Sequence, residues 1–148
     1  MNSHIETKCV HGDKHKYQES TRAVSVPIYQ TASFSHTELG HNGSGFDYTR
    51  ESNPTRQHLE ETLSSLEGAA DTMAFSSGMA AVSVCFGLFH PGDHIVCSED
   101  LYGGTVRLLH DVVEQNGLSV SFVDTTDLNA LQAALRPDTK AIYIETPS

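Results

Sequence analysis

The sequence predicts an α/β fold in which a mostly parallel β-sheet carries helices on its faces. The first observation is an alternation: after residue 71, short apolar runs of strand length take turns with longer segments of helical pattern. The second observation is the position of the turn-forming residues: glycine and proline separate these segments at Pro91-Gly92, Gly117 and Pro137. Strands separated by helices of this length form βαβ units, whose strands pair in parallel.

Length, composition and charge narrow the functional classes. The 148 residues, 38% of them hydrophobic, suffice for a globular unit with its own core. A formal net charge of −10 without any Lys/Arg cluster argues against a nucleic-acid or anionic-membrane surface. No apolar run reaches the ~18 residues of a membrane span, and the first residues lack the apolar core of a signal peptide. We therefore expect a cytoplasmic protein without nucleic-acid or membrane partners.

Cysteine and histidine positions do not predict a disulfide or a metal site. The cysteines are odd in number and lack a C-x-x-C pair, which predicts buried free thiols. They are Cys9, Cys85 and Cys97. Two histidine pairs have i,i+4 spacing, but Pro91-Gly92 interrupts the second and no further ligand type recurs beside the first. These pairs are His11/His15 and His90/His94, and we expect no metal at either.

Residues 1–52 and 53–148 are expected to play different parts. Residues 1–52 form a polar arm with an extended piece at 24–29 and a flexible loop at 41–45. Such an arm buries too little apolar area to order itself, so we expect it to lie on its own domain or on a partner subunit. Residues 53–148 are interpreted as a compact domain.

The second segment begins with a helix whose ends are legible in the sequence. Asn53 can cap it, Pro54 suits its first turn, and Gly68 can adopt the left-handed conformation that ends it. Its leucines recur at helical spacing, at Leu59, Leu63 and Leu66. The remaining expected elements are strands at 72–75, 94–97, 118–123 and 141–145, and helices at 79–89, 102–115 and after Asp127. The helix at 79–89 is apolar almost all round, which predicts burial.

The corner at 75–81 is the first candidate site. After an apolar approach, the turn at Ser77, Gly78 and Met79 opens a helix and presents backbone N–H groups that favour a phosphate. Taken alone the signal is weak, because any tight turn into a helix favours Ser and Gly. The segment 100–102 and Glu145 also follow predicted strands, and the carboxyl ends of parallel strands share one edge. We expect these three features to converge there.

Several motifs in the same order resemble the trans-sulfuration enzymes that use pyridoxal phosphate. The family includes cystathionine γ-synthase, cystathionine γ-lyase, methionine γ-lyase and O-acylhomoserine sulfhydrylase. The motifs are Tyr48-Thr49-Arg50-Glu51-Ser52-Asn53-Pro54-Thr55, Leu66-Glu67-Gly68, Ser77-Gly78-Met79-Ala80, Pro91-Gly92-Asp93, Leu101-Tyr102-Gly103-Gly104-Thr105 and Glu145-Thr146-Pro147-Ser148. The resemblance implies a fold-type I pyridoxal-phosphate transferase (aspartate-aminotransferase-like). Residues 1–52 would then be the N-terminal arm, and 53–148 an incomplete large cofactor-binding domain.

The resemblance also implies roles for single residues. Ser77, Gly78 and Met79 would hold the cofactor phosphate, and Tyr102 would stack on the pyridine ring and take part in proton transfer. Glu145 would stand close to the ring in a supporting position. Without the resemblance, Tyr102 would be a half-buried aromatic and Glu145 a solvated strand end.

A second group of implied roles concerns the neighbouring subunit. Tyr48 and Arg50 would reach that subunit's cofactor phosphate, with Arg50 as a charge-assisted donor; otherwise they would be a surface pair. Active sites would be shared, so that a homodimer is the smallest functional unit and a tetramer is expected. Gly104 stands where methionine γ-lyases carry a cysteine, which favours cystathionine-type enzymes or sulfhydrylases.

The sequence departs from the family at its end. The aspartate that pairs with the pyridine nitrogen, the Schiff-base lysine and the substrate-binding arginine of the family lie beyond Glu145-Thr146-Pro147-Ser148. We therefore expect an N-terminal part of a longer enzyme, inactive alone, whose complete form carries out γ-elimination or γ-replacement on sulfur amino acids or homoserine esters. The alternative is a truncated, non-catalytic chain that assembles with an intact subunit.

Overall fold

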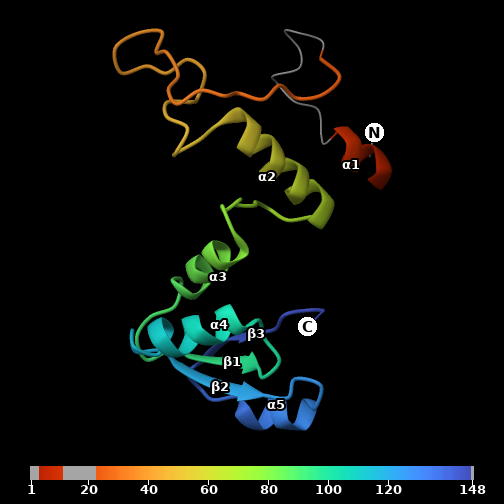
Figure 1. Ribbon diagram of the computed structural model, residues 1–148, viewed down its shortest axis with the longest axis vertical. Helices are drawn as coiled ribbons and strands as arrows, with labels where there is room; N and C mark the ends of the chain where they lie inside the picture. Colours follow the sequence, from red (N-terminus) through yellow and green to blue (C-terminus); the bar gives the residue numbers. More distant parts are fainter. Residues whose placement is uncertain (1–3, 12–22, 148) are drawn as a thin grey trace. The chain divides into compact units, whose positions relative to one another are not determined.

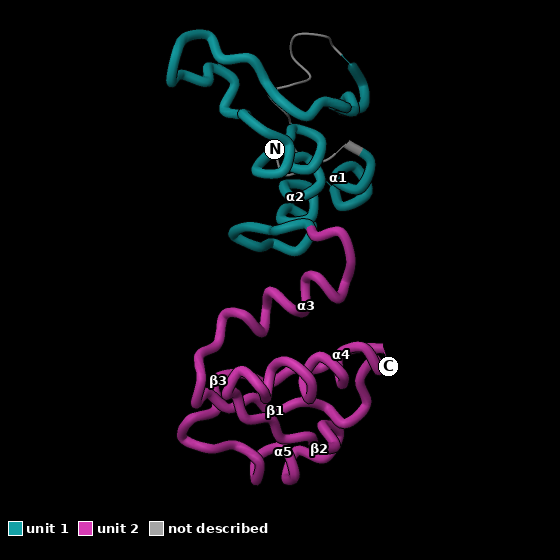
Figure 2. Tube along the Cα trace, turned by 60° about the vertical axis from the view of Figure 1, so that its left-hand side comes forward, with its two compact units in different colours: residues 1–74 teal, residues 75–148 magenta. Residues whose placement is uncertain are grey.

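The computed structural model describes residues 4–11 and 23–147. Lys14, His15 and Lys16 lie outside the described residues, as does Ser148. The chain divides into two compact units, residues 1–74 and 75–148, which Figure 2 shows in different colours. The boundary expected at residue 52 separates an arm that contacts a partner subunit from the cofactor-binding domain, and this division stays a prediction.

The described residues of unit 1 form two helices, of which the sequence predicted one. Helix α2 (Pro54–Glu67) has the expected ends: the Asn53 side chain accepts from Thr55 N, and Gly68 ends the helix with φ 64°. Helix α1 (Ile5–His11) was not expected, because the arm was interpreted as irregular. It packs against α2, and Lys8 Nζ donates to the carbonyl of Ser65 at 3.4 Å. Contact with α2 thus supports a helix that its own sequence pattern does not specify.

The rest of the described arm folds back on itself through backbone hydrogen bonds. Ser33 and Tyr48 form an antiparallel bridge, and the amide of Phe34 donates to the carbonyl of Asp47 at 2.9 Å. The rings of Phe34 and Phe46 lie 5.4 Å apart between centroids. The Asn53 side chain ties this segment to α2 by donating to the carbonyl of Tyr29 at 3.1 Å. The segment that carries Tyr48 is therefore held in a defined conformation.

Unit 2 contains the predicted parallel sheet (Figure 1). Strand β1 (His94–Ser98) lies in the middle, with β2 (Ser119–Val123) and β3 (Thr139–Tyr143) parallel to it on either side. The α/β fold class with parallel pairing is thus confirmed. The last strand ends two residues earlier than expected, so that Ile144 and Glu145 lie beyond the ladder.

The strand expected at 72–75 is wrong. None of the strands in the described part of the chain pairs with these residues. Their hydrogen bonds go to α2 instead: the amide of Ala74 donates to Glu60 Oε1 at 2.9 Å, and Ser64 Oγ donates to Thr72 Oγ1 at 2.7 Å. An apolar run becomes a strand only where a neighbouring strand offers backbone partners, and here side chains of a helix offer them.

The other helices of unit 2 confirm the alternation. They are α3 (Gly78–Phe86), α4 (Gly103–Leu108), its wider-turned π-helical continuation η1 (Leu109–Val113) and α5 (Leu128–Ala134). Figures 1 and 2 show α4 and α5 on opposite faces of the sheet. The core forms between the sheet, η1 and the end of α3, from Phe86, Ile95, Cys97, Leu109, Val113 and Leu118. None of the described helices is long and apolar enough to cross a membrane.

Burial of α3 and of the cysteines differs from expectation. Phe86 is the buried residue of α3, whereas Val84 is 46% exposed. Cys97 is buried in β1, but Cys9 and Cys85 are exposed free thiols, so the expectation of burial is wrong for these two. A helix that is apolar all round needs neighbours on every side to be covered, and within unit 2 it is α4 and the core that contact α3.

Candidate cofactor site

The N-terminus of α3 offers backbone donors to an anion. Ser77 caps the helix, and its Oγ accepts from the amide of Ala80 at 3.1 Å. The preceding amides, of Gly78 and Met79, have no acceptor within the helix because they lie in its first turn. A Cβ placed on Gly78 would meet no atom within 4 Å, so the space beside this backbone is open. The turn therefore fits a phosphate group, with the helix dipole favouring negative charge.

Tyr102 stands at the start of α4 and its ring lies over Gly104. The side chain is 63% exposed, and Tyr102 occupies the N-cap position without a side-chain capping bond. A Cβ on Gly104 would collide with Cε1 of the Tyr102 ring and would lie 3.2 Å from Met79 Sδ. A glycine is thus required for this position of the ring. The same glycine brings the start of α3 next to the start of α4.

Glu145 joins this group from the carboxyl end of β3. Its carboxylate accepts from the backbone N–H of Tyr102 at 2.7 Å, from Thr105 Oγ1 at 2.7 Å and from Tyr143 OH at 2.9 Å. These bonds, the one from the Tyr102 amide foremost, lower the pKa of Glu145. Burial first, and then the bond to Glu145, raises the pKa of Tyr143 to about 12. At neutral pH the carboxylate is therefore ionised and the phenol is protonated.

The structure thus brings together the predicted residues of unit 2, although it does not test their roles. Met79, Tyr102 and Glu145 meet at one rim. The rule on carboxyl ends of parallel strands accounts for Tyr102, which follows β1, and for Glu145, which follows β3. It does not account for Met79, because the strand expected before it does not form. A hollow of about 580 Å³ opens beside this rim, and Glu145 lines it together with the acidic residues Glu99, Asp100 and Asp124. Ser77, Gly78, Met79 and Tyr102 do not line it.

Sequence reasoning missed Thr105 and Tyr143 as parts of the site. The sequence spacing of each residue from a predicted site residue could have indicated it. Tyr143 is two residues before Glu145, so the two side chains share one side of an extended chain. Thr105 is three residues after Tyr102, which places both on one side of a helical turn. Only the contact with Glu145, 40 positions from Thr105, makes them members of the same cluster.

Tyr48 and Arg50 lie in unit 1 and form a pair there. The guanidinium carbon of Arg50 is 5.0 Å from the centre of the Tyr48 ring, within range of a cation–π interaction. Arg56 supports the segment from α2, since its guanidinium donates to the carbonyls of Thr49 and Arg50 at 3.4 Å each. The contact of this pair with a partner's phosphate stays a prediction.

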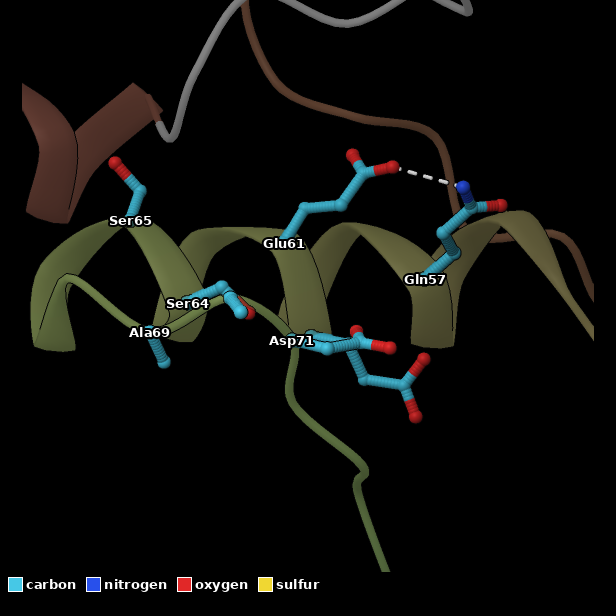
Figure 3. Close-up of a pocket in the computed structure, with 8 residues that line it drawn as sticks. Gln57, Glu61, Ser64, Ser65, Ala69 and Asp71 are labelled. Atoms are coloured by element: carbon cyan, nitrogen blue, oxygen red, sulfur yellow. Dashed lines mark hydrogen bonds between the residues drawn. The ribbon is translucent and has the colours of Figure 1, made fainter.

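A different hollow in unit 1 is unsuited to a phosphate. Its volume is about 390 Å³, it lies beside α2, and Figure 3 shows that the carboxyl groups of Glu61 and Asp71 line it. Gln57 Nε2 donates to Glu61 Oε1 at 2.8 Å across its edge. Carboxylates repel an anionic ligand, and none of the predicted site residues lines this hollow. Among residues 4–11 and 23–147, no group of three or more His, Cys, Asp or Glu side chains is arranged to hold a metal ion.

Comparison with known proteins identifies the family. Residues 6–148 match the family described as Cys/Met metabolism PLP-dependent enzyme. Cystathionine beta-lyase of Lactococcus lactis subsp. cremoris (strain MG1363) is 45% identical over 144 residues, 97% of this chain and 37% of that protein. Cystathionine gamma-synthase/O-acetylhomoserine (thiol)-lyase of Bacillus subtilis (strain 168) is 41% identical over 148 residues, 100% of this chain and 39% of that protein.

A solved structure agrees in fold. The cystathionine gamma-lyase of Lactobacillus plantarum, complexed with L-serine, matches with a TM-score of 0.89 and 42% identity. The match covers 99% of this chain and 38% of that one, so this chain spans less than two fifths of the length of such relatives. The cofactor of the family is pyridoxal 5'-phosphate, which suits the open, donor-rich start of α3. The chain belongs to the pyridoxal-phosphate-dependent enzymes of cysteine and methionine metabolism.

Proposed function

We propose that this chain is the N-terminal part of an enzyme that carries out γ-elimination or γ-replacement on sulfur amino acids or homoserine esters. The observation that carries the proposal is the meeting of Met79, Tyr102 and Glu145 at one rim in a member of this family. The part spans less than two fifths of the length of the Lactococcus and Bacillus relatives, and we expect it to be inactive when alone. We expect the complete protein to act in the cytoplasm.

The residues of unit 2 would bind and orient the cofactor. Backbone N–H groups of Ser77, Gly78 and Met79 would hold its phosphate, aided by the helix dipole. The ring of Tyr102 would stack on the pyridine, and its phenol oxygen would accept and return a proton at the substrate. The bound cofactor would supply an electron sink, which makes the C–H bond on the amino-bearing carbon acidic and then those on the neighbouring carbon. Glu145 would support the ring's surroundings rather than react.

The residues of unit 1 would complete a partner's site. Arg50 would donate charge-assisted hydrogen bonds to the phosphate bound by the neighbouring subunit, and Tyr48 would add its hydroxyl. The carbonyls held by Arg56 keep this segment in shape for such a contact. The proposal therefore includes a homodimer with shared active sites, and a tetramer as the expected assembly.

A second candidate is β-elimination, which the name of the Lactococcus relative favours. The two reactions cleave different C–S bonds of cystathionine. With water, γ-elimination releases cysteine, ammonia and a four-carbon 2-oxo acid, whereas β-elimination releases homocysteine, ammonia and pyruvate. Identifying the oxo acid formed from cystathionine by the complete polypeptide separates them, and pyruvate as the main product would replace the γ-proposal.

The role of Tyr102 is tested by Tyr102→Phe in the complete polypeptide. Loss of the phenol removes a proton-transfer group, so turnover should fall about 100-fold or more. Tyr29→Phe is the matched control, because it removes the same hydroxyl from a tyrosine that has no proposed role in the reaction; its rate should equal that of the unchanged enzyme. A Tyr102→Phe rate within about twofold of normal would contradict the assigned role.

The non-catalytic alternative predicts a different molecule. An intact mass equal to that of the 148 residues, together with co-purification of a longer subunit, would support an assembling chain without its own activity. A larger mass would show that the chain belongs to a complete enzyme, as proposed.

A further inference from the structure

The carboxylate of Glu145 uses both oxygens inside the protein. Oε1 accepts from Thr105 Oγ1 and Tyr143 OH, and Oε2 accepts from the backbone N–H of Tyr102. Thr105 is 1% exposed and Glu145 is half-buried. A carboxylate occupied in this way holds its neighbours in place, because each bond would have to break before the group could turn toward a ligand.

The peptide units on both sides of Tyr102 are held. Glu145 takes the N–H of Tyr102, while the carbonyl of Tyr102 accepts from the amides of Thr105 at 2.8 Å and Val106 at 3.2 Å. Tyr102 cannot cap α4 with its own side chain, since an aromatic ring offers no short acceptor at this position. With both neighbouring peptide groups held, the ring can turn only about its own side-chain torsions, and the absence of a side chain at Gly104 leaves room for its present position.

The same cluster reaches the start of α3. Thr105 Oγ1 lies 3.9 Å from Met79 Sδ while it donates to Glu145. Met79 Sδ in turn borders Gly104, over which the Tyr102 ring lies. The phosphate-binding turn and the aromatic ring are therefore linked through one buried threonine and one carboxylate.

We propose that Glu145 is a positioning residue: Thr105 and Tyr143 orient its carboxylate, which holds the backbone of Tyr102 and so sets the ring beside the α3 turn. It does so before any cofactor binds and without touching the cofactor. The inference rests on the proposed function only for what the ring then does. The bond to the Tyr102 amide can be tested independently.

The first test is amide hydrogen exchange in the cofactor-free complete polypeptide. The Tyr102 amide precedes α4, so its protection depends on Glu145. Glu145→Ala should speed its exchange by about 10-fold or more, and Glu145→Gln, which keeps an acceptor oxygen, should retain most of the protection. Glu99→Ala is the matched control: it removes a carboxylate that follows β1 on the same rim, and Tyr102 should exchange as before.

A structural defect would give a different pattern. The amide of Val96, in the central strand, should keep its protection in every variant. Unchanged exchange at Tyr102 in Glu145→Ala, or an equal loss at Val96, would overturn the proposal. If Glu145→Ala does not fold, Thr105→Val and Tyr143→Phe each remove one bond to the carboxylate, and both should speed exchange at Tyr102 without affecting Val96.

Kinetics of the loaded enzyme then separate this inference from the proposed function. Glu145→Ala should lower kcat more than it raises KM and should shift the limb of the pH profile that Tyr102→Phe abolishes; Glu145→Gln should restore most of the rate. If Tyr102→Phe has no effect, the proposed role of Tyr102 fails, and the exchange data still decide whether Glu145 holds it. A normal pH profile and kcat in Glu145→Ala would contradict the positioning role.

Discussion

The two units of the chain are held together by different interactions. In unit 2, the central strand and the helix that covers it bury their apolar side chains: Ile95, Val96 and Leu109 are each 0% exposed. Among the described residues of unit 1, the buried apolar side chains are Phe46 and Pro54. Unit 1 instead relies on hydrogen bonds between backbone segments and on a few polar side chains such as Asn53.

The two units should tolerate different kinds of substitution. A sheet with helices on its faces obtains its stability from apolar burial, which is spread over many side chains. A segment held by hydrogen bonds depends on single polar groups, because each leaves a backbone partner unsatisfied when it is removed. Unit 1 also exposes apolar side chains, including Ile28 at 83% and Leu59 at 51%. Unit 2 should therefore be sensitive to apolar truncation and unit 1 to polar truncation.

The largest effect is expected from Ile95→Ala in the core of unit 2. Removing a buried isoleucine leaves a cavity in a packed sheet, so the free energy of unfolding should fall by about 2–5 kcal/mol. Ile28→Ala makes the same chemical change at an exposed site of unit 1 and should alter stability by no more than about 0.5 kcal/mol. Urea unfolding followed by circular dichroism measures both. Equal losses would show that the two units do not differ in this way.

A smaller effect is expected from Asn53→Ala in unit 1. Its side chain caps α2 and donates to the carbonyl of Tyr29 and to Thr49 Oγ1, so its loss should destabilise unit 1 by about 1–2 kcal/mol. Amide exchange should rise from Tyr29 to Thr55 and stay unchanged in the sheet. Asn42→Ala removes one exposed bond to Gly45 and should affect only its own loop. Faster exchange throughout unit 2 would contradict the separation of the units.

The smallest effect concerns pH and the buried histidine of the sheet. His94 bridges all three strands, with Nδ1 2.7 Å from Thr139 Oγ1 and Nε2 3.0 Å from Ser121 Oγ. Burial, and then the positive charge of Arg136, lowers the pKa of His94 from 6.5, while Asp138 acts in the opposite direction. The unfolded chain therefore binds a proton at a higher pH than the folded chain does.

It follows that the stability contributed by neutral His94 is complete above pH 6.5 and is lost as pH falls through the lowered pKa. The measurement is the free energy of unfolding at pH 7.5 and pH 5 for the unchanged protein and for His94→Gln, which cannot titrate. The loss on acidification should be smaller in His94→Gln. An equal loss in both would assign the pH dependence to other groups.

Local signals in the sequence were sufficient to predict most helices and strands of unit 2 and helix α2 of unit 1. Asn53, Ser77 and Asp127 each cap the helix that follows them, because a cap acts on amides only two or three residues away. Gly117, with φ 89°, ends the helical segment before β2 as expected. Such signals fail where the partner is distant: residues 72–75 have an apolar run of strand type but bond to side chains of α2.

The candidate site was predictable in its location and not in its interactions. The rule that ligands collect at the carboxyl ends of parallel strands placed Tyr102 and Glu145 on one rim, and the structure has them hydrogen-bonded. The rule does not say which way a carboxylate turns. Glu145 faces Thr105 and Tyr143, and that choice depends on the register of β3 against β1 and on the burial of Thr105.

By itself, the sequence determined the α/β class, the ends of α2 and the family, because these depend on short-range spacing and on motifs. The assignment of Ser77, Gly78 and Met79 to a phosphate stays a prediction. Tertiary structure alone decided that α1 forms against α2, that residues 72–75 are not a strand, and that α3 buries Phe86 but exposes Cys85. It also decided that Glu145 holds the backbone of Tyr102. The physical reason is the same throughout: burial and hydrogen-bond partners come from segments distant in sequence, and no local pattern specifies which segment will be near.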